Sequence, residues 1–124
     1  MTIAGKTFPQ HFRLTDKAEF DLVFHRGNRV NSSLFTAIVL SNNLNHPRLG
    51  LAISRRSANS AVARNRLKRQ IRETFRHEAE NLTSIDVVVL ARPEAATQNN
   101  KICQESLGEL WNKVNQVCAL SSSH

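Results

Sequence analysis

A short run near residue 90 constrains the fold of this chain more than any other feature. Residues 86–91 read DVVVLA, which is apolar on both faces of an extended strand. Residues 34–40 read LFTAIVL and also carry apolar side chains on both sides. Strands that are apolar on both faces belong in the interior of a sheet. The two segments therefore predict a sheet with a buried centre.

Local signals predict the elements around these two strands. The residues Asp-Lys-Ala-Glu at 16–19 are typical of a helix N-terminus, and Gly27 marks the predicted end of that helix. The Asn-rich loop 41–47 ends in proline and predicts a hairpin into the next strand, residues 48–54. In that strand large apolar residues alternate with small or polar ones, so one side is predicted to be buried. A further short strand is predicted around residues 29–31.

Two long helices complete the predicted fold. The first covers about residues 60–80. At about 100° per residue, its apolar stripe consists of Ala63, Leu67, Ile71, Thr74 and Phe75. The opposite side carries Asn65, Lys68, Arg69, Arg72 and Arg76. The last helix covers about residues 100–118 and is predicted to bury Ile102, Leu107, Leu110, Trp111 and Val114.

The chain is predicted to form one domain over residues 1–124, because 124 residues suit a single hydrophobic core. Residues 1–12 are predicted to be an extended arm and residues 119–124 a disordered tail. The order of the elements is that of an α+β fold in which helices pack on one mixed, four-stranded sheet.

The two cysteines, Cys103 and Cys118, are predicted to be ordinary thiols. Fifteen helical positions at about 1.5 Å each separate them by roughly 22 Å, which is too far for a disulfide. No further Cys or His stands at the spacing of a zinc site.

The net charge points to a polyanionic partner. Seventeen basic residues against 10 acidic ones give a formal charge of +7 and a pI near 10.5, an excess that attracts nucleic acid. The longest apolar run, Val87 to Ala91, is far below the ~20 residues that span a bilayer. Residues 1–10 lack the pattern of a secretory signal. We therefore expect no membrane segment and a cytoplasmic location.

The positive charge is concentrated in one segment. Between Arg48 and Arg76 lie nine of the 17 basic residues and only one acid, Glu73. A charged helix face is ordinarily solvated and held by ion pairs between residues four apart. Here the acidic partners are missing, and like charges such as Lys68 and Arg72 repel each other. This pattern favours a surface that a polyanion normally covers.

RNA is a better match to this surface than DNA. Arginine dominates the segment, and its planar guanidinium both grips phosphate and stacks on bases. A strand precedes the helix, whereas a helix-turn-helix unit would place a short helix and a tight turn there.

The same segment carries a recognisable motif. Residues 63–73 read ARNRLKRQIRE and follow RLGLAISRR at 48–56. This combination resembles the RNR signature of the bacterial ribonuclease P protein and the strand that precedes it. The signature is specific, because it requires arginine, asparagine and lysine at fixed offsets. The resemblance extends from about Arg13 to about Val114, nearly the whole chain.

The resemblance implies that the basic helix docks on a catalytic RNA, the ribonuclease P RNA. The residues that match the motif are Arg64, Asn65, Arg66, Lys68, Arg69 and Arg72. The resemblance also implies that this helix crosses between two parallel strands in the rare left-handed sense, in the fold called ribosomal protein S5 domain 2-like.

A separate concave face is implied to bind the single-stranded 5′ leader of precursor tRNA. By position, it would consist of Phe20, Phe24, Thr36, Ile38, Ala52, Ser54, Arg55, Arg56 and Arg92. Aromatic rings accept unstacked bases at about 1–3 kcal/mol each, and small side chains let RNA lie close to a sheet. The alternative interpretation is that Phe20 and Phe24 only anchor the first helix in the core.

The chain departs from the family pattern at two positions. Members often carry tyrosine where Ile38 lies, but this chain has no tyrosine. A pair of basic residues is common after the last strand, whereas Arg92 is followed by Pro93. We therefore expect an altered leader preference and a weaker basis for the role of Arg92.

The sequence predicts no catalytic and no metal-binding residue. A nuclease that acts alone needs clustered carboxylates or a histidine with a partner base, and His77-Glu78-Ala79-Glu80 lacks the spacing of a metal-binding helix motif. The resemblance implies that the RNA carries out the hydrolysis and holds the Mg²⁺, with one protein per RNA. The protein would bind the leader, raise substrate affinity and lower the Mg²⁺ requirement. Two alternatives stay open: a noncatalytic RNA-binding protein such as a ribosomal component, and a protein-only endonuclease.

Overall fold

The computed structural model describes residues 12–82 and 84–122 of the chain. Its elements follow the predicted order, including the short additional strand. They are α1 (Lys17–Arg26), β1 (Asn28–Asn31), β2 (Phe35–Ser41), β3 (Arg48–Ala52), α2 (Ala61–Glu78), β4 (Ile85–Ala91), the 3-10 helix η2 (Pro93–Thr97) and α3 (Asn100–Ser122). The predicted α+β class with a four-stranded mixed sheet is confirmed.

The sheet order is β1-β2-β4-β3. β2 pairs antiparallel with both β1 and β4, whereas β3 pairs parallel with β4. The prediction of a hairpin between β2 and β3 is therefore wrong, because β4 lies between them. β4 is buried on both faces and gains more from the central position than the half-polar β3 would. α2 connects the two parallel strands, and the left-handed sense of that crossover stays a prediction.

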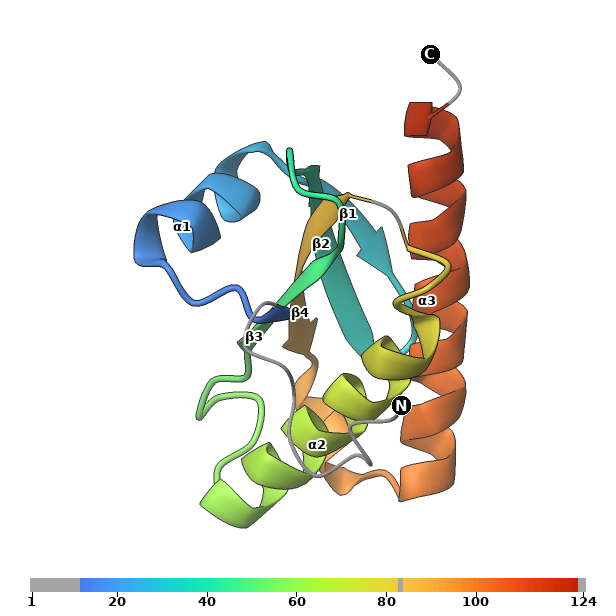
Figure 1. Cartoon of the computed structure of the whole chain (residues 1–124). Helices are drawn as coiled ribbons and strands as arrows, with labels where there is room; N and C mark the ends of the chain where they lie inside the picture. Colours follow the sequence, from blue (N-terminus) through green and yellow to red (C-terminus); the bar gives the residue numbers. More distant parts are fainter. Residues whose placement is uncertain (1–11, 83, 123–124) are drawn as a thin grey trace, which may run out of the picture.

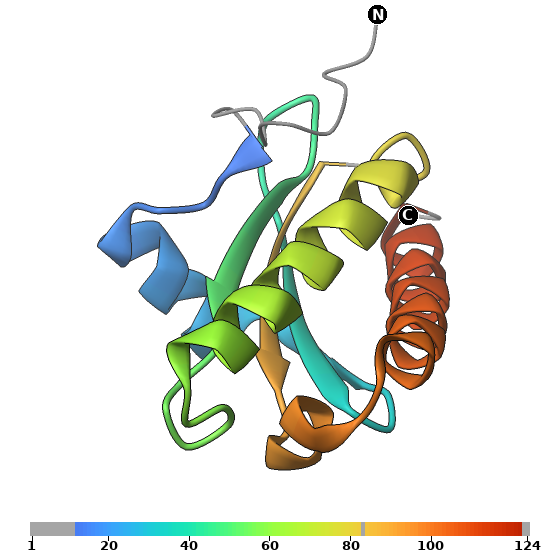
Figure 2. The ribbon, with the colours of Figure 1, turned by 90° about the horizontal axis from the view of Figure 1, so that it is seen from below.

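The helices cover the two faces of the sheet unequally (Figures 1 and 2). α2 and α3 lie side by side on one face, and the short helix α1 lies on the other. The side chain of Asp16 caps α1 as predicted, accepting hydrogen bonds from the backbone N–H groups of Ala18 and Glu19. Gly27 ends that helix. Ser60 caps α2 in the same way, with a bond from the N–H of Ala63.

The larger core lies between the sheet and the helices α2 and α3. Of the predicted stripe of α2 it contains Leu67, Ile71 and Phe75, with Ala63 packed against it, whereas Thr74 is only partly buried. It also contains four of the five residues predicted for α3, namely Leu107, Leu110, Trp111 and Val114. Ile102 is an exception: it is 39% exposed, and Cys103 points inward in its place. The difference arises because the inward face of α3 begins one residue later than its apolar pattern indicates.

The smaller core lies beneath α1 and consists of Leu14, Val23, Ile38 and Val88. Five partly buried side chains pack around it: Phe20, Phe24, Leu40, Ala52 and Leu90. This face of the sheet is thus only partly closed by its helix.

The two ends of the chain differ from the expectations in part. Most of the predicted arm, residues 1–11, lies outside the described residues, but Phe12 packs edge-on against Phe75 with ring centroids 6.2 Å apart. The predicted tail is helical over residues 119–122, because α3 continues to Ser122.

Candidate nucleic-acid interface

α2 carries its polar side chains on both sides of its buried stripe, above two separate grooves. Lys68 and Arg72 line a groove beside β3. Asn65, Arg66 and Arg69 line a second groove beside the start of α3. The helical repeat explains this division, since residues four apart share a side of the helix.

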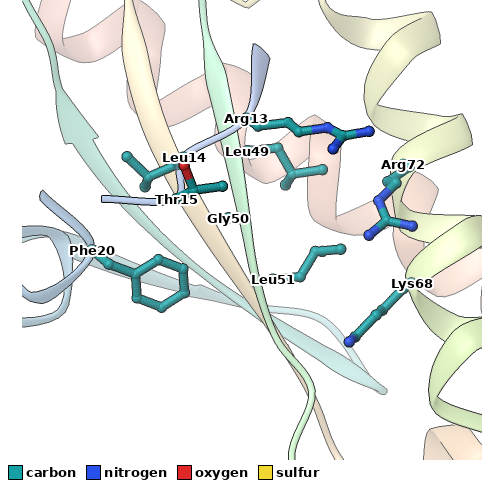
Figure 3. Close-up of a pocket in the computed structure, with 9 residues that line it drawn as sticks. All are labelled: Arg13, Leu14, Thr15, Phe20, Leu49, Gly50, Leu51, Lys68 and Arg72. Carbon is teal, nitrogen blue, oxygen red and sulfur yellow. The ribbon is translucent and has the colours of Figure 1, made fainter. Parts of the chain in front are cut away.

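The groove beside β3 follows the outer edge of the sheet and has a volume of about 320 Å³. Figure 3 shows Lys68 and Arg72 reaching from α2 toward one side of β3, while Phe20 lies on the other side of that strand. Arg13 closes one end, where it forms an isolated parallel bridge with Leu49. The groove therefore joins the basic side of α2 to the aromatic side chains of α1.

Two of the basic residues that line this groove, Lys68 and Arg72, have no acidic partner among the described residues. Partial burial lowers the pKa of the Arg72 guanidinium, and the positive charge of Arg13 lowers it further. Arg72 keeps its positive charge at neutral pH, as arginine side chains do in proteins. An anion that enters the groove would relieve this desolvation and repulsion.

Two arginines of the motif are engaged by the protein itself. Arg66 donates hydrogen bonds to the backbone oxygens of Ala96 and Gln98 and to Asn100 Oδ1, at 3.0, 3.3 and 3.0 Å. Arg64 donates to the backbone oxygens of Ala58 and Asn59. Arg66 thereby ties α2 to η2 and α3, where a helix end leaves carbonyl groups to be satisfied. The guanidinium of Arg66 is thus engaged within the protein, and its role at RNA phosphates stays a prediction.

The remaining motif residues are open to a partner. Asn65 is exposed, and the side chain of Arg69 is 80% exposed. Arg69 pairs only loosely with Glu73, with Nε and Oε2 3.7 Å apart. This is the one acid that the sequence places among the basic residues.

The second set of predicted residues lies on the α1 face of the sheet. The rings of Phe20 and Phe24 are tilted against each other with centroids 5.6 Å apart, and both are partly buried. A Cβ atom on Gly50 would lie 2.7 Å from Phe20 Cε2, so the strand must carry glycine for this ring to approach. The two phenylalanines contact the smaller core and also keep exposed surface.

Beyond α1, a row of half-buried side chains crosses the sheet. Thr36 of β2 is paired with Leu90 of β4, and Leu90 is paired with Ala52 of β3. Ile38, two residues from Thr36 on the same face, is fully buried under α1. The prediction that Ile38 lines the surface is therefore wrong for its side chain, because the helix covers that row.

The basic residues expected at this surface lie at one end of the row. Ser54, Arg55 and Arg56 are exposed in the turn that follows β3, and Arg92 is exposed just after β4. Ser57 Oγ donates to the backbone oxygen of Ala91 at 2.7 Å, which holds that turn against the end of β4. The structure thus brings the three arginines to the same end of the sheet.

An ion-pair network that the sequence did not reveal holds α1 on the sheet. Arg48 donates to both carboxylate oxygens of Asp86, at 2.9 and 2.8 Å, and to Glu19 of α1 at 3.1 Å. Asn42 also donates to Asp86, at 2.8 Å. The hydrogen bonds with Asp86 raise the pKa of Arg48 above its ordinary value, against a smaller effect of burial. The available signal was Asp86 itself, an acid in a strand that is otherwise apolar.

Neither a metal centre nor a membrane span is found in the described part of the chain. Residues 12–82 and 84–122 contain no group of three His, Cys, Asp or Glu side chains that could hold a metal ion. Over the same ranges, every helix is too short or too polar to cross a bilayer.

The fold and its basic and aromatic surfaces define an α+β RNA-binding protein. The chain belongs to the ribonuclease P protein family, whose model, Ribonuclease P, matches residues 8–115. The ribonuclease P protein component of Methylococcus capsulatus is 41% identical over 119 residues, which cover 96% of this chain and 93% of the relative.

Solved structures agree with this assignment. The RNase P protein of Staphylococcus aureus is similar with a TM-score of 0.77 and 29% identity, over 82% of this chain and 93% of that one. A structure of a mutant of the S. aureus protein, described as having defective mRNA degradation activity, gives a TM-score of 0.78 at 29% identity, over 83% and 87%. The chain is therefore a subunit of the ribonucleoprotein endoribonuclease that acts in tRNA processing, and its partner is RNA.

Proposed function

We propose that the chain binds ribonuclease P RNA through the outer side of α2 and holds the 5′ leader of precursor tRNA on the sheet face beside α1. One protein binds one RNA. The observation that carries this proposal is that basic side chains of α2 and the aromatic ring of Phe20 lie on opposite sides of the edge strand β3.

The charge on α2 supports docking on a folded RNA. Lys68, Arg69 and Arg72 present positive charge, and among the described residues only Arg69 has an ion-pair partner, the loosely held Glu73. If about five phosphates are neutralised, log K falls with log salt at a slope near −4. Binding that depends this strongly on salt is expected of a protein that grips an RNA backbone.

The α1 face supports binding of a single strand. The partly buried rings of Phe20 and Phe24 offer stacking surfaces. The row from Thr36 through Leu90 to Ala52 is also only partly buried, so a single strand can contact it. Arginines at the end of the row can contact the leader phosphates. Stacking tolerates any base, which suits leaders of varied sequence.

The protein contributes binding, and the RNA contributes the chemistry. The residues present do not fit a magnesium site, because the described part of the chain contains no suitable cluster. Two of its carboxylates, Glu19 and Asp86, are also paired with Arg48. We propose that the Mg²⁺ ions are held mainly by the RNA. By gripping the leader the protein raises substrate affinity. By supplying positive charge between two RNAs it lowers the Mg²⁺ concentration that the assembly requires.

One cleavage assay tests the proposal against its two alternatives. Precursor tRNA is incubated with the protein alone, with a bacterial ribonuclease P RNA alone, and with both at low Mg²⁺. We expect no cleavage by the protein and strong stimulation of the RNA. Cleavage by the protein alone would favour a protein-only nuclease, a possibility raised by the mRNA degradation ascribed to the S. aureus relative. Binding to ribosomal RNA without any stimulation would favour a ribosomal component.

A further inference from the structure

The groove between α2 and α3 differs chemically from the groove beside β3. It has a volume of about 600 Å³ and is lined by four amides, two arginines, one glutamate and one valine. Of its lining residues, those that matter here are Val62, Asn65, Arg69, Gln70, Asn100 and Gln104. It also contains Glu73, whose negative charge opposes a phosphate. Of its two arginines, Arg66 already donates hydrogen bonds within the protein and Arg69 pairs with Glu73. The groove is therefore suited to a neutral, polar ligand.

Gln70 is the unusual residue of this groove. Its side chain is buried, with 6% of the residue exposed. Its Nε2 donates to Asn100 Oδ1 at 3.0 Å, but its Oε1 has no hydrogen-bond partner among the described residues. An enclosed carbonyl without a donor destabilises the folded state. A ligand that donates a hydrogen bond to this oxygen would remove that penalty.

Asn100 supplies the complementary group next to Gln70. Its Oδ1 accepts bonds from Arg66 Nη1 and from Gln70 Nε2, both at 3.0 Å, so the orientation of the amide is fixed. The Nδ2 group of Asn100 therefore remains a donor. The two hydrogen-bonded amides thus offer one acceptor, on Gln70, and one donor, on Asn100. The edge of a nucleobase carries donors and acceptors that can pair with such groups.

The rim of the groove suits a planar ligand. Val62 is 79% exposed, which is unusual for an apolar side chain on a charged helix. Arg69 lies on the same side of α2 with its guanidinium largely in solvent. One face of a base can pack on Val62, and the guanidinium of Arg69 can stack on the other face, since guanidinium groups stack on aromatic planes.

We propose that this groove binds one unpaired nucleobase of the ribonuclease P RNA, read by Gln70 and Asn100. This inference rests on the proposed function, because it requires that α2 docks on that RNA. It adds a base-specific contact to an interface otherwise made with phosphates. The two grooves of α2 then have different tasks: the one beside β3 binds backbone, and the one beside α3 selects a base.

The test is the variant Gln70→Leu, which keeps the volume of the side chain and removes the unpaired carbonyl. We expect affinity for a bacterial ribonuclease P RNA to fall about tenfold, with no change in the slope of log K against log salt, because a base contact releases no counterions. Gln116→Leu makes the same substitution on an exposed part of α3 and should leave binding unchanged. Thermal unfolding of the variants checks that Gln70→Leu is folded.

Chemical probing of the RNA identifies the base. Dimethyl sulfate reads unpaired adenine and cytosine, and a carbodiimide reads uracil and guanine. We expect one base to be protected by the wild-type protein and by Gln116→Leu but exposed with Gln70→Leu. Gln104→Ala, an exposed rim substitution that does not threaten folding, should expose the same base in part.

The outcomes separate this inference from the proposed function. If the wild-type protein does not bind the RNA, both fail. If Arg72→Ala weakens binding and Gln70→Leu binds and protects as the wild type does, only the base site is refuted. A flatter salt slope for Gln70→Leu would also overturn it, because the groove would then hold a phosphate.

Discussion

The two faces of the sheet are built from similar strands but closed to different degrees. The face under α2 and α3 buries large side chains from the sheet and from both helices, among them Phe35, Phe75 and Trp111. The face under α1 buries only a small cluster and leaves aromatic rings partly exposed. A long helix pair makes one face a stabilising core, whereas a ten-residue helix leaves the other face available for binding.

The largest expected difference between the faces is in stability. Trp111 is fully buried, contacts Phe75 at 5.7 Å between centroids and donates its N–H to Thr74 Oγ1 at 2.9 Å. Trp111→Ala should lower the free energy of unfolding by about 3–5 kcal/mol, as measured by urea denaturation. Leu22→Ala, at a position of α1 that is 47% exposed, should change it little. Equal losses would mean that the two faces contribute alike.

The next effect concerns the attachment of α1. Asp86→Ala removes the partner of Arg48 and leaves a largely buried guanidinium without its main acceptor. We expect the free energy of unfolding to fall by about 3 kcal/mol. Amide hydrogen exchange should report the greatest loss of protection in α1. Asp21→Ala breaks an exposed pair with Lys17 and serves as the control; similar protection in both variants would contradict the proposed role of the network.

A single methyl group tests the contact between β3 and α1. In Gly50→Ala the new Cβ would meet Phe20 Cε2 at 2.7 Å, so the ring must move. We expect a loss of about 1–3 kcal/mol in unfolding free energy together with weaker leader binding. Gly108→Ala places its Cβ in open space on α3 and should stabilise the protein by up to about 1 kcal/mol. If Gly50→Ala and Gly108→Ala change the free energy of unfolding in the same direction, the close contact between β3 and Phe20 does not require glycine.

The contribution of an aromatic ring to leader binding can be tested with only a small loss of apolar volume. Phe24→Leu keeps a large apolar side chain and removes the ring. Affinity for a precursor tRNA with a leader should fall about tenfold, as expected for one lost stack, while affinity for leaderless tRNA stays constant. Measurements are made on the assembled ribonucleoprotein. If affinity is unchanged and only stability falls, Phe24 is a core anchor alone.

The smallest effect is a pH dependence within the larger core. Burial raises the pKa of the Cys103 thiol, against smaller opposing effects of Arg66. The folded state therefore holds the neutral thiol more tightly than the unfolded chain does. This contribution is complete below the ordinary thiol pKa of about 8.5 and is lost as the pH rises above it. Denaturation between about pH 7 and pH 10 should show a steeper decline for the wild type than for Cys103→Ala; parallel curves would contradict it.

Local signals in the sequence predicted the elements well, because caps and periodicity act over a few residues. Asp16, Gly27 and the stripe of α2 lie where their patterns place them. Strand neighbours were not predictable in the same way. The loop at 41–47 has the composition of a hairpin, but sheet order depends on the burial of β4, which follows much later in the chain.

The sequence predicted the positions of some candidate site residues and not the surroundings of others. The positions of Lys68, Arg69 and Arg72 follow from helical geometry alone. That Arg66 bonds to carbonyl groups of η2, and that α1 covers Ile38, depends on contacts between distant segments. The periodicity of a sequence predicts the direction in which a side chain leaves its own helix or strand. It does not predict which distant segments of the chain will contact that side chain.

The central position of β4 also has a consequence for synthesis. A ribosome synthesises β1, β2 and β3 before β4 (Ile85–Ala91). During that interval β2 and β3 lack the strand that lies between them in the finished sheet. Until that strand emerges, both present open edges to which other chains can add. The nascent protein can complete its sheet only when three-quarters of its length exists, and chaperones or the RNA itself would be most useful in that interval.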